Sequence, residues 1–212
     1  LLLYPPFMMK MCLKSKTFYI GKAFHGKINY GEEGDPDTLF LYYAPIRLIQ
    51  IDKENTSYQL QNEILYTRDG HILCQALKND NADSQLTIPS CVTEIADGAF
   101  YRNSEFGAIE VKGSLERIGI SAFACADVGS FYVKGGVNYL DRGSFYQSAI
   151  SEWRCHGGVK KYEKSAFQDV DATNGYAIDM NAITKLYQEL LYVNATTDLS
   201  DWVKTIWNWI IM

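Results

Sequence analysis

The sequence contains no apolar run of the roughly 18 residues that a membrane-spanning helix needs. It also lacks an excess of positive charge, because its formal net charge is −5. This argues against a general nucleic-acid binder, which needs a concentrated basic surface. The five cysteines form no CxxC pair and the three histidines lie far apart, so the clustered ligands of a zinc site are missing. The sequence therefore predicts no transmembrane span, no nucleic-acid partner and no metal.

The motifs that usually carry catalysis are missing as well. There is no glycine-rich phosphate loop, no HExxH and no GxSxG. Cys155 and His156 are adjacent, but neighbouring residues of a strand point to opposite faces, so the two cannot act together. We therefore predict no catalytic residue, no cofactor and no enzymatic activity.

The sequence does contain a repeat, which is most visible as a phenylalanine that returns every 22 or 23 residues after a small residue. The members of this column are Phe100, Phe123, Phe145 and Phe167. Apolar residues recur eight and five places earlier, and further upstream two apolar residues alternate with one other residue. The alternating pairs are Leu86 and Ile88, Ile109 and Val111, Phe131 and Val133, and Trp153 and Cys155.

A repeat of this length cannot bury its apolar face alone, so stacked copies must share one extended core. The alternating pair predicts a short strand, and parallel strands of successive repeats then form one sheet. The Ala-Phe pair predicts a turn or short helix on the far side. Cys155 occupies the column of Ile88, Val111 and Val133, so we expect its thiol to be buried.

Two features upstream extend this interpretation. Residues 46–51 have the spacing of a fifth strand of the same sheet. Residues 62–75 contain Asp69-Gly70 between two apolar runs, which predicts a β-hairpin because a tight turn needs positive φ.

These repeats resemble those of the BspA-type leucine-rich repeat proteins. The best copy is LTIPSCVTEIADGAF, from Leu86 to Phe100, and the second copy keeps the glycine as Ile118-Gly119. The hairpin segment is also similar to an insertion found in that family. The resemblance implies an α/β repeat, namely a leucine-rich-repeat solenoid with short parallel strands on one face. It also implies a secreted or surface-attached protein of the adhesion type.

We expect three regions. Residues 1–45 hold a degenerate N-terminal repeat and an insertion loop, although the apolar start also fits a truncated signal peptide. Residues 46–170 form the solenoid with its inserted hairpin, and residues 171–212 form a helical C-terminal cap that covers the last repeat. Tryptophans in the last region leave a second interpretation open, in which its helix docks on a partner or a membrane surface.

The predicted binding surface consists of the strand residues that point away from the core. The first row holds the residue between the two inward positions of each strand, namely Gln50, Thr87, Glu110, Tyr132 and Arg154. The second row holds the residue just after each pair, namely Asp52, Pro89, Lys112, Lys134 and His156. Three residues of the second row are basic or can become so, which suits an acidic partner. The alternative is a solvated face that only keeps the sheet soluble.

Two hypotheses for function remain at this point. The first is a non-enzymatic protein-binding module whose partner is a protein or another cell-surface macromolecule, because solenoids present wide, regular surfaces. The second is a structural spacer within the repeat region of a larger surface protein. Both place the chain outside the cell or on its surface through the family resemblance.

Overall fold

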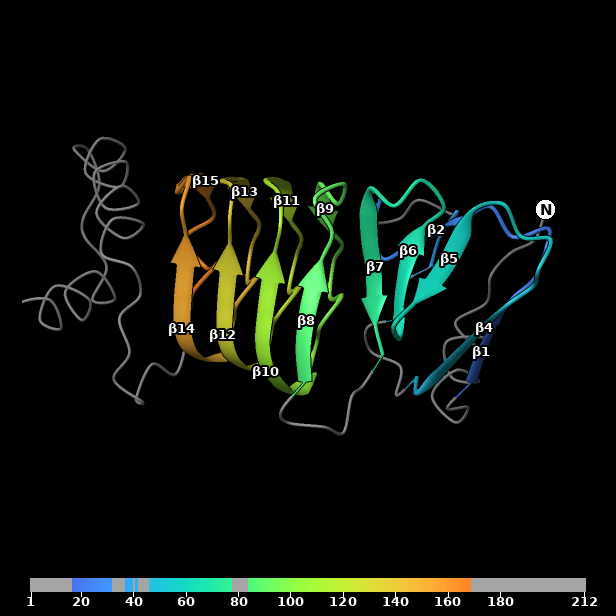
Figure 1. Cartoon of the computed structure of the whole chain (residues 1–212), viewed down its shortest axis with the longest axis horizontal. Coiled ribbons are helices and arrows are strands. Elements are labelled where there is room, and N and C mark those ends of the chain that lie inside the picture. Colours follow the sequence, from blue (N-terminus) through green and yellow to red (C-terminus); the bar gives the residue numbers. More distant parts are fainter. Residues whose placement is uncertain (1–16, 32–36, 40, 42–45, 78–83, 169–212) are drawn as a thin grey trace, which may run out of the picture.

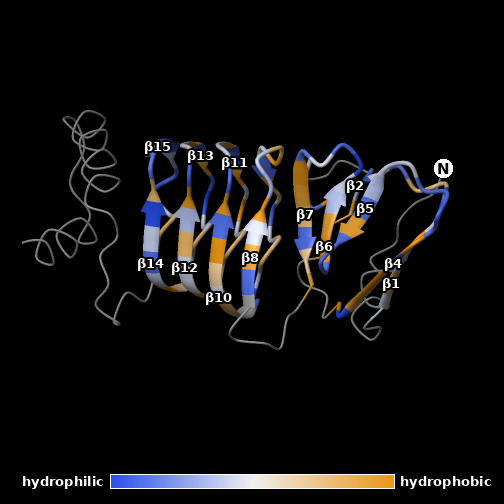
Figure 2. Cartoon of the chain, in the orientation of Figure 1, coloured by the Kyte–Doolittle hydropathy of each residue, from blue (hydrophilic) through white to orange (hydrophobic). Residues whose placement is uncertain are grey.

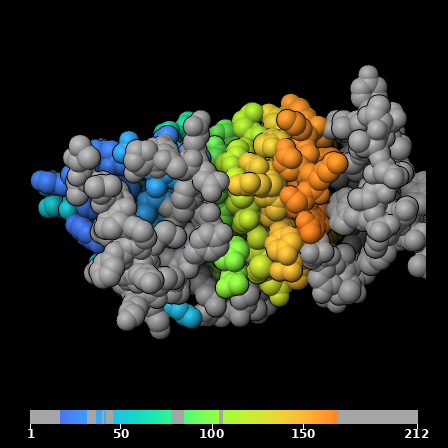
Figure 3. Space-filling view, turned by 180° about the vertical axis from the view of Figure 1, so that it is seen from behind, coloured from blue at the N-terminus to red at the C-terminus, as the bar shows by residue number. Residues whose placement is uncertain are grey.

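The structure is a computed structural model that describes residues 17–31, 37–39, 41, 46–77 and 84–168. Within residues 84–168 the chain winds so that successive repeats stack side by side, with parallel strands along two sides of the stack (Figure 1). From behind, the repeats follow one another as bands from green to orange (Figure 3).

The first sheet of the stack has four parallel strands in the order β14-β12-β10-β8. These strands are β8 (Ser84–Ile88), β10 (Ser104–Val111), β12 (Asp127–Val133) and β14 (Ala149–Cys155). Leu86, Ile109, Phe131 and Trp153 are aligned across them. The prediction that these four segments lie side by side is therefore confirmed.

A second sheet runs along another side of the same stack, where the sequence predicted no strands. Its parallel strands are β9 (Glu94–Ile95), β11 (Leu115–Ile118), β13 (Val137–Leu140) and β15 (Val159–Tyr162). The prediction of strands on one face only is wrong. Inward residues three apart, such as Leu115 and Ile118, lack the alternation that predicts a strand, yet their backbone pairs with the equivalent segment of the next repeat.

The predicted α/β class is also wrong, because the described residues form no helix. In the Ala-Phe turns, alternate amides bond to the next repeat, so a continuous run of helical hydrogen bonds cannot form. The amide of Phe100 donates to the carbonyl of Ala122 at 2.7 Å, and that of Phe123 donates to Ser144 at the same distance. The chain is thus a β-solenoid over its described repeats, and the predicted cap at residues 171–212 lies outside the described residues.

The predicted hairpin is confirmed and extends the second sheet beyond β9. β6 (Ile64–Thr67) and β7 (Ile72–Ala76) pair antiparallel, and β5 (Tyr58–Gln61) adds to β6. Gly70 has a φ of 75°, which the turn between β6 and β7 requires and which only glycine adopts freely.

The N-terminal strands form sheets of their own. β1 (Thr17–Ile20) pairs in parallel with β4 (Leu48–Ile51), and β2 (Lys27–Ile28) pairs with β3 (Thr38–Leu39). The strand predicted within residues 46–51 therefore exists, but it does not join the four-stranded sheet. In Figure 1 the hairpin strands lie between β4 and β8.

A stack of phenylalanine rings forms the centre of the repeat core. The ring centroids of Phe100 and Phe123 are 4.6 Å apart, those of Phe123 and Phe145 are 5.0 Å apart, and Phe167 continues the row at 5.2 Å. Both hydrophilic and hydrophobic residues occur along the front strands, as expected for a sheet with one side on the core (Figure 2). Cys155 is 2% exposed, as the column predicts.

We expect Ser121→Gly to raise the free energy of unfolding by about 0.5–1 kcal/mol. Ser121 has a φ of 52°, and the equivalent positions of the neighbouring repeats hold Gly98 at 58° and Gly143 at 60°. Urea unfolding measures the change. The matched control is Ser165→Gly, at the same place two repeats further on but outside the positive-φ region, where the substitution should destabilise. Equal effects at both serines would contradict this account of the turn.

Candidate functional site

The outward side of the four-stranded sheet, here called the four-strand face, contains most of the predicted binding residues. Thr87, Glu110, Tyr132 and Arg154 are direct neighbours across β8, β10, β12 and β14. They form one continuous row, because each strand keeps the same register with the next. Four of the five residues predicted for the first row therefore lie side by side as expected, and Gln50 does not.

Gln50 lies elsewhere, and its assignment to this row is wrong. It is exposed on β4, but its backbone neighbour is Tyr19 of β1. Asp52, which follows β4, accepts a hydrogen bond from the Tyr19 hydroxyl at 2.9 Å. The backbone amide of Glu54 and then the Tyr19 hydroxyl hold the pKa of Asp52 below its usual range.

The second row continues the sheet by one residue beyond each strand. The amide of Lys112 donates to Ile88 at 3.0 Å, that of Lys134 donates to Val111 at 3.0 Å, and that of His156 donates to Val133 at 3.1 Å. These bonds fix the three backbone positions one above another. The three side chains are exposed, so the structure brings them together on one surface as the sequence predicts.

Basic side chains of this face lie beside carboxylates, a pairing that the sequence did not predict. Glu110 Oε2 lies 2.5 Å from Lys112 Nζ, and Glu110 Oε1 lies 3.6 Å from Lys134 Nζ. The bond from Lys112, more than that from Lys134, holds the pKa of Glu110 below its usual range. Arg154 likewise contacts Glu152 on its own strand. Residues two apart on a strand face the same way, so Lys112 reaches Glu110 along its own strand, and Lys134 reaches the same carboxylate from the next strand.

An aromatic pair connects the two rows. The hydroxyl of Tyr132 lies 3.2 Å from His156 Nε2, and the two rings meet edge to face with centroids 5.1 Å apart. Tyrosine and arginine are enriched among residues that dominate binding energy. Tyr132 and Arg154 are direct neighbours, so this part of the face combines an aromatic surface with a charged one.

Sequence reasoning missed an ionic cluster on the second sheet. Arg117 of β11 contacts Glu94 at 2.8 Å, Asp97 at 2.5 Å and Asp141 at 2.9 Å. Asp97 Oδ1 also accepts the amide of Ile120 at 2.8 Å. The signal in the sequence is the opposite charge of Glu94 and Arg117 at equivalent repeat positions, which gains meaning only when β9 and β11 are known to pair.

The pKa values of this cluster follow from burial and charge together. Burial raises the pKa of Asp97 by more than the nearby guanidinium lowers it. Burial alone lowers the pKa of Arg117, but its contacts with Asp97 and Glu94 outweigh burial and raise the pKa above its usual value. All the partners of Arg117 belong to adjacent repeats, so the cluster joins one repeat to the next.

In the part of the chain that the structure describes, no three histidine, cysteine or acidic residues form a group that could hold a metal ion. The described residues also include no helix long and apolar enough to cross a membrane.

Comparisons with known proteins agree with the repeat architecture. A family model described as "BspA type Leucine rich repeat region" matches residues 70–174 with six copies. A search of curated proteins gave no match.

Two solved structures are similar to this chain. One is the pneumococcal vaccine antigen PcpA, at 14% identity and a TM-score of 0.50, covering 77% of this chain and 56% of that one. Another is a leucine-rich repeat protein from Eubacterium ventriosum, at 12% identity and a TM-score of 0.32, covering 76% of this chain and 60% of that one. This chain thus spans less than two thirds of either structure. Residues 70–174 of the chain are a BspA-type leucine-rich repeat region.

Proposed function

We propose that the chain is a non-enzymatic protein-binding module of an extracellular or cell-surface adhesion protein, and that it binds through the four-strand face. The observation that carries the proposal is the continuous row of Thr87, Glu110, Tyr132 and Arg154 on adjacent strands. A regular row of polar and aromatic side chains on a rigid sheet is the usual recognition surface of a solenoid. The second row adds Lys112, Lys134 and His156 to this surface.

The surface location rests on the repeat family and on the similar structure. BspA-type repeats imply an exported protein, and the similar pneumococcal protein is named a vaccine antigen. An antigen useful in a vaccine must be accessible to antibodies, which supports an exposed location for a protein of this fold.

The non-enzymatic part of the proposal rests on how the charged residues are used. The most buried ionic cluster, around Arg117, connects backbone and side chains of neighbouring repeats. The charges of the four-strand face pair with one another at its surface. These arrangements have a structural explanation or suit recognition, and neither requires chemistry.

A combined Lys112→Glu, Tyr132→Ala and Arg154→Glu variant tests the proposal. We expect it to keep the melting behaviour of the wild type and to lose roughly tenfold or more of its affinity for a retained partner. Binding is measured on a panel of immobilised extracellular proteins from host tissue. The matched control is Lys160→Glu with Lys164→Glu, which reverses two exposed charges away from the four-strand face.

Loss of binding in the first variant but not in the control supports the proposal. Equal retention in both variants places the binding surface elsewhere. If the wild type retains no member of the panel, the structural spacer becomes the better account of the chain.

A further inference from the structure

The four-stranded sheet ends at β8, while the second sheet continues past β9 through the hairpin strands. The strand that the sequence placed next to β8, now β4, pairs with β1 instead. Among the described residues, β8 therefore has a strand on one side only. The inserted hairpin extends one side of the stack through β7, β6 and β5, and the described residues supply no matching strand on the other side.

The direction of the β8 backbone groups follows from its pairing with β10. The carbonyl of Ile88 accepts the amide of Lys112 at 3.0 Å, so Ile88 faces β10. Backbone groups of alternate strand residues point to opposite sides, so Leu86 also faces β10. Gln85 and Thr87 then direct their N–H and C=O groups away from β10, toward the open edge. Both residues are exposed.

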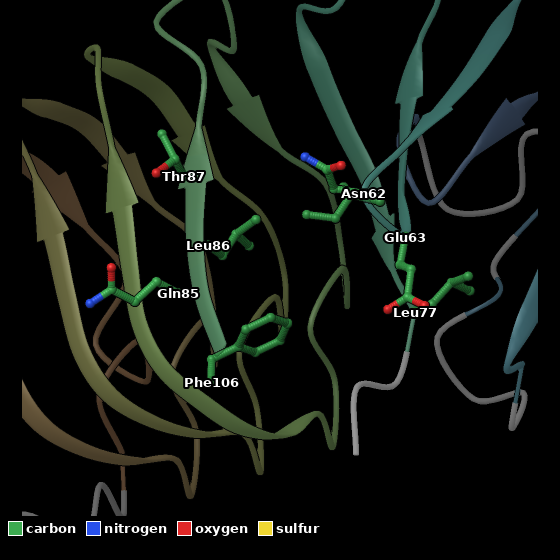
Figure 4. A pocket seen from close by; sticks show the side chains of 8 residues that line it. Asn62, Glu63, Leu77, Gln85, Leu86, Thr87 and Phe106 are labelled. Atoms are coloured by element: carbon green, nitrogen blue, oxygen red, sulfur yellow. The ribbon is translucent and has the colours of Figure 1, made fainter. Parts of the chain in front are cut away.

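A pocket of about 440 Å³ lies along this edge. In Figure 4, Leu86 and Phe106 lie on one side of it, and Asn62, Glu63 and Leu77 of the hairpin region lie on the other. Leu86 is 9% exposed and Phe106 is 6% exposed, whereas Ile109 in the next strand is fully buried. Leu86 and Phe106 thus form an apolar wall of the pocket and keep only a small exposed area there.

We propose that this edge binds an extended peptide segment of a partner protein. The segment adds to β8 as a further strand, bonds to the backbone of Gln85 and Thr87, and places an apolar side chain in the pocket beside Leu86. A basic residue of the same segment lies near the exposed carboxylate of Glu63. This inference rests on the proposed function and names the class of partner.

The observations favour a peptide over the other occupants. Main-chain bonds to an open strand edge supply affinity, and a pocket for a single side chain supplies specificity. A small apolar molecule leaves the polar edge of β8 unused. In a second copy of this chain, Leu86 and Ile88 are buried in its own core, so β8 of that copy offers no apolar side chain to the pocket.

The test uses the full chain and a phage-displayed library of linear ten-residue peptides. We expect wild-type protein to enrich peptides with an apolar residue close to a lysine or arginine. Thr87→Pro removes the outward N–H of the edge and should weaken binding of an enriched peptide by about tenfold. The matched control Thr87→Val keeps the N–H and the branched shape, so the difference in affinity between the two variants measures the contribution of the backbone N–H. Glu63→Gln should weaken peptides that carry the basic residue.

A second measurement uses only wild-type protein and therefore does not depend on how the proline variant folds. Methylation of alternate backbone nitrogens in the enriched peptide should abolish binding in one register and spare it in the other. Equal binding by Thr87→Pro and Thr87→Val, or by all methylated peptides, overturns the proposal, as does failure to enrich any peptide. Self-association of the wild type that Thr87→Pro removes shows instead that a second copy occupies the edge.

The variant of the four-strand face separates this inference from the proposed function. The combined Lys112, Tyr132 and Arg154 variant leaves the pocket residues unchanged, so it should retain the enriched peptide. If the peptide binds to β8 while the face variant keeps its partner, the edge is a binding site and the four-strand face is not.

Discussion

Replacing Phe123 with alanine is expected to lower the free energy of unfolding by about 3–5 kcal/mol. Phe123 is fully buried and stacks between the rings of Phe100 and Phe145, with Phe131 meeting it edge to face. The substitution therefore removes contacts in both directions along the stack. A rigid ladder of backbone bonds surrounds the site, so the cavity cannot collapse at low cost.

The control is Phe167→Ala, at the end of the described stack. Phe167 is only partly buried and stacks on Phe145, so its removal should cost clearly less. Urea unfolding followed by circular dichroism measures both variants. Equal losses for the two, or an unchanged midpoint for Phe123→Ala, would show that the ring stack does not hold the repeats together.

The sequence predicted the repeat stack because its signal lies in the spacing itself. When phenylalanine returns at a nearly constant interval after a small residue, stacking copies is the simplest way to bury every ring. The alternating pairs from Leu86 to Cys155 carried similar information, and their register is as predicted.

The second sheet and the absence of helix in the described residues were not predictable in the same way. Local periodicity reports which residues face the core, but not which backbone group bonds to which. The amide of Phe123 could have closed a helical turn, yet it donates to Ser144 of the next repeat. That choice depends on the neighbouring coil, which a window of sequence does not contain.

The candidate face was predicted in part, and its errors have physical causes. Gln50 lies between two inward residues of a strand, as predicted. The inserted hairpin separates that strand, β4, from β8, and β4 pairs with β1 instead. The pairing of the lysines in the second row was not predicted, because each position was considered only along its own column. Glu110 reaches lysines on its own strand and on the next one.

The ionic cluster of the second sheet gives the other large expected effect, since Arg117→Met should lower the free energy of unfolding by roughly 2–4 kcal/mol. The side chain of Arg117 is only 25% exposed and that of Asp97 only 6% exposed. Removing the guanidinium leaves the buried Asp97 carboxylate without a cation, while Glu94 and Asp141 remain close to it. The exposed pair of Arg154 and Glu152 supplies the control, because Arg154→Met should cost less than about 1 kcal/mol.

The dependence on pH distinguishes a lost charge from lost packing. Burial already raises the pKa of Asp97 in the wild type, and removal of Arg117 raises it further in the folded state. The folded variant then binds a proton more readily than the unfolded chain, so its stability rises as the pH falls through that raised pKa. The deficit in the free energy of unfolding relative to wild type should be largest near pH 7 and smaller at about pH 4.

Asp97→Asn in the Arg117→Met background should recover part of the lost stability at neutral pH, because the amide oxygen can still accept the Ile120 N–H without a charge. A deficit that stays constant with pH and is not relieved by Asp97→Asn would mean that Arg117 acts through the packing of its side chain alone.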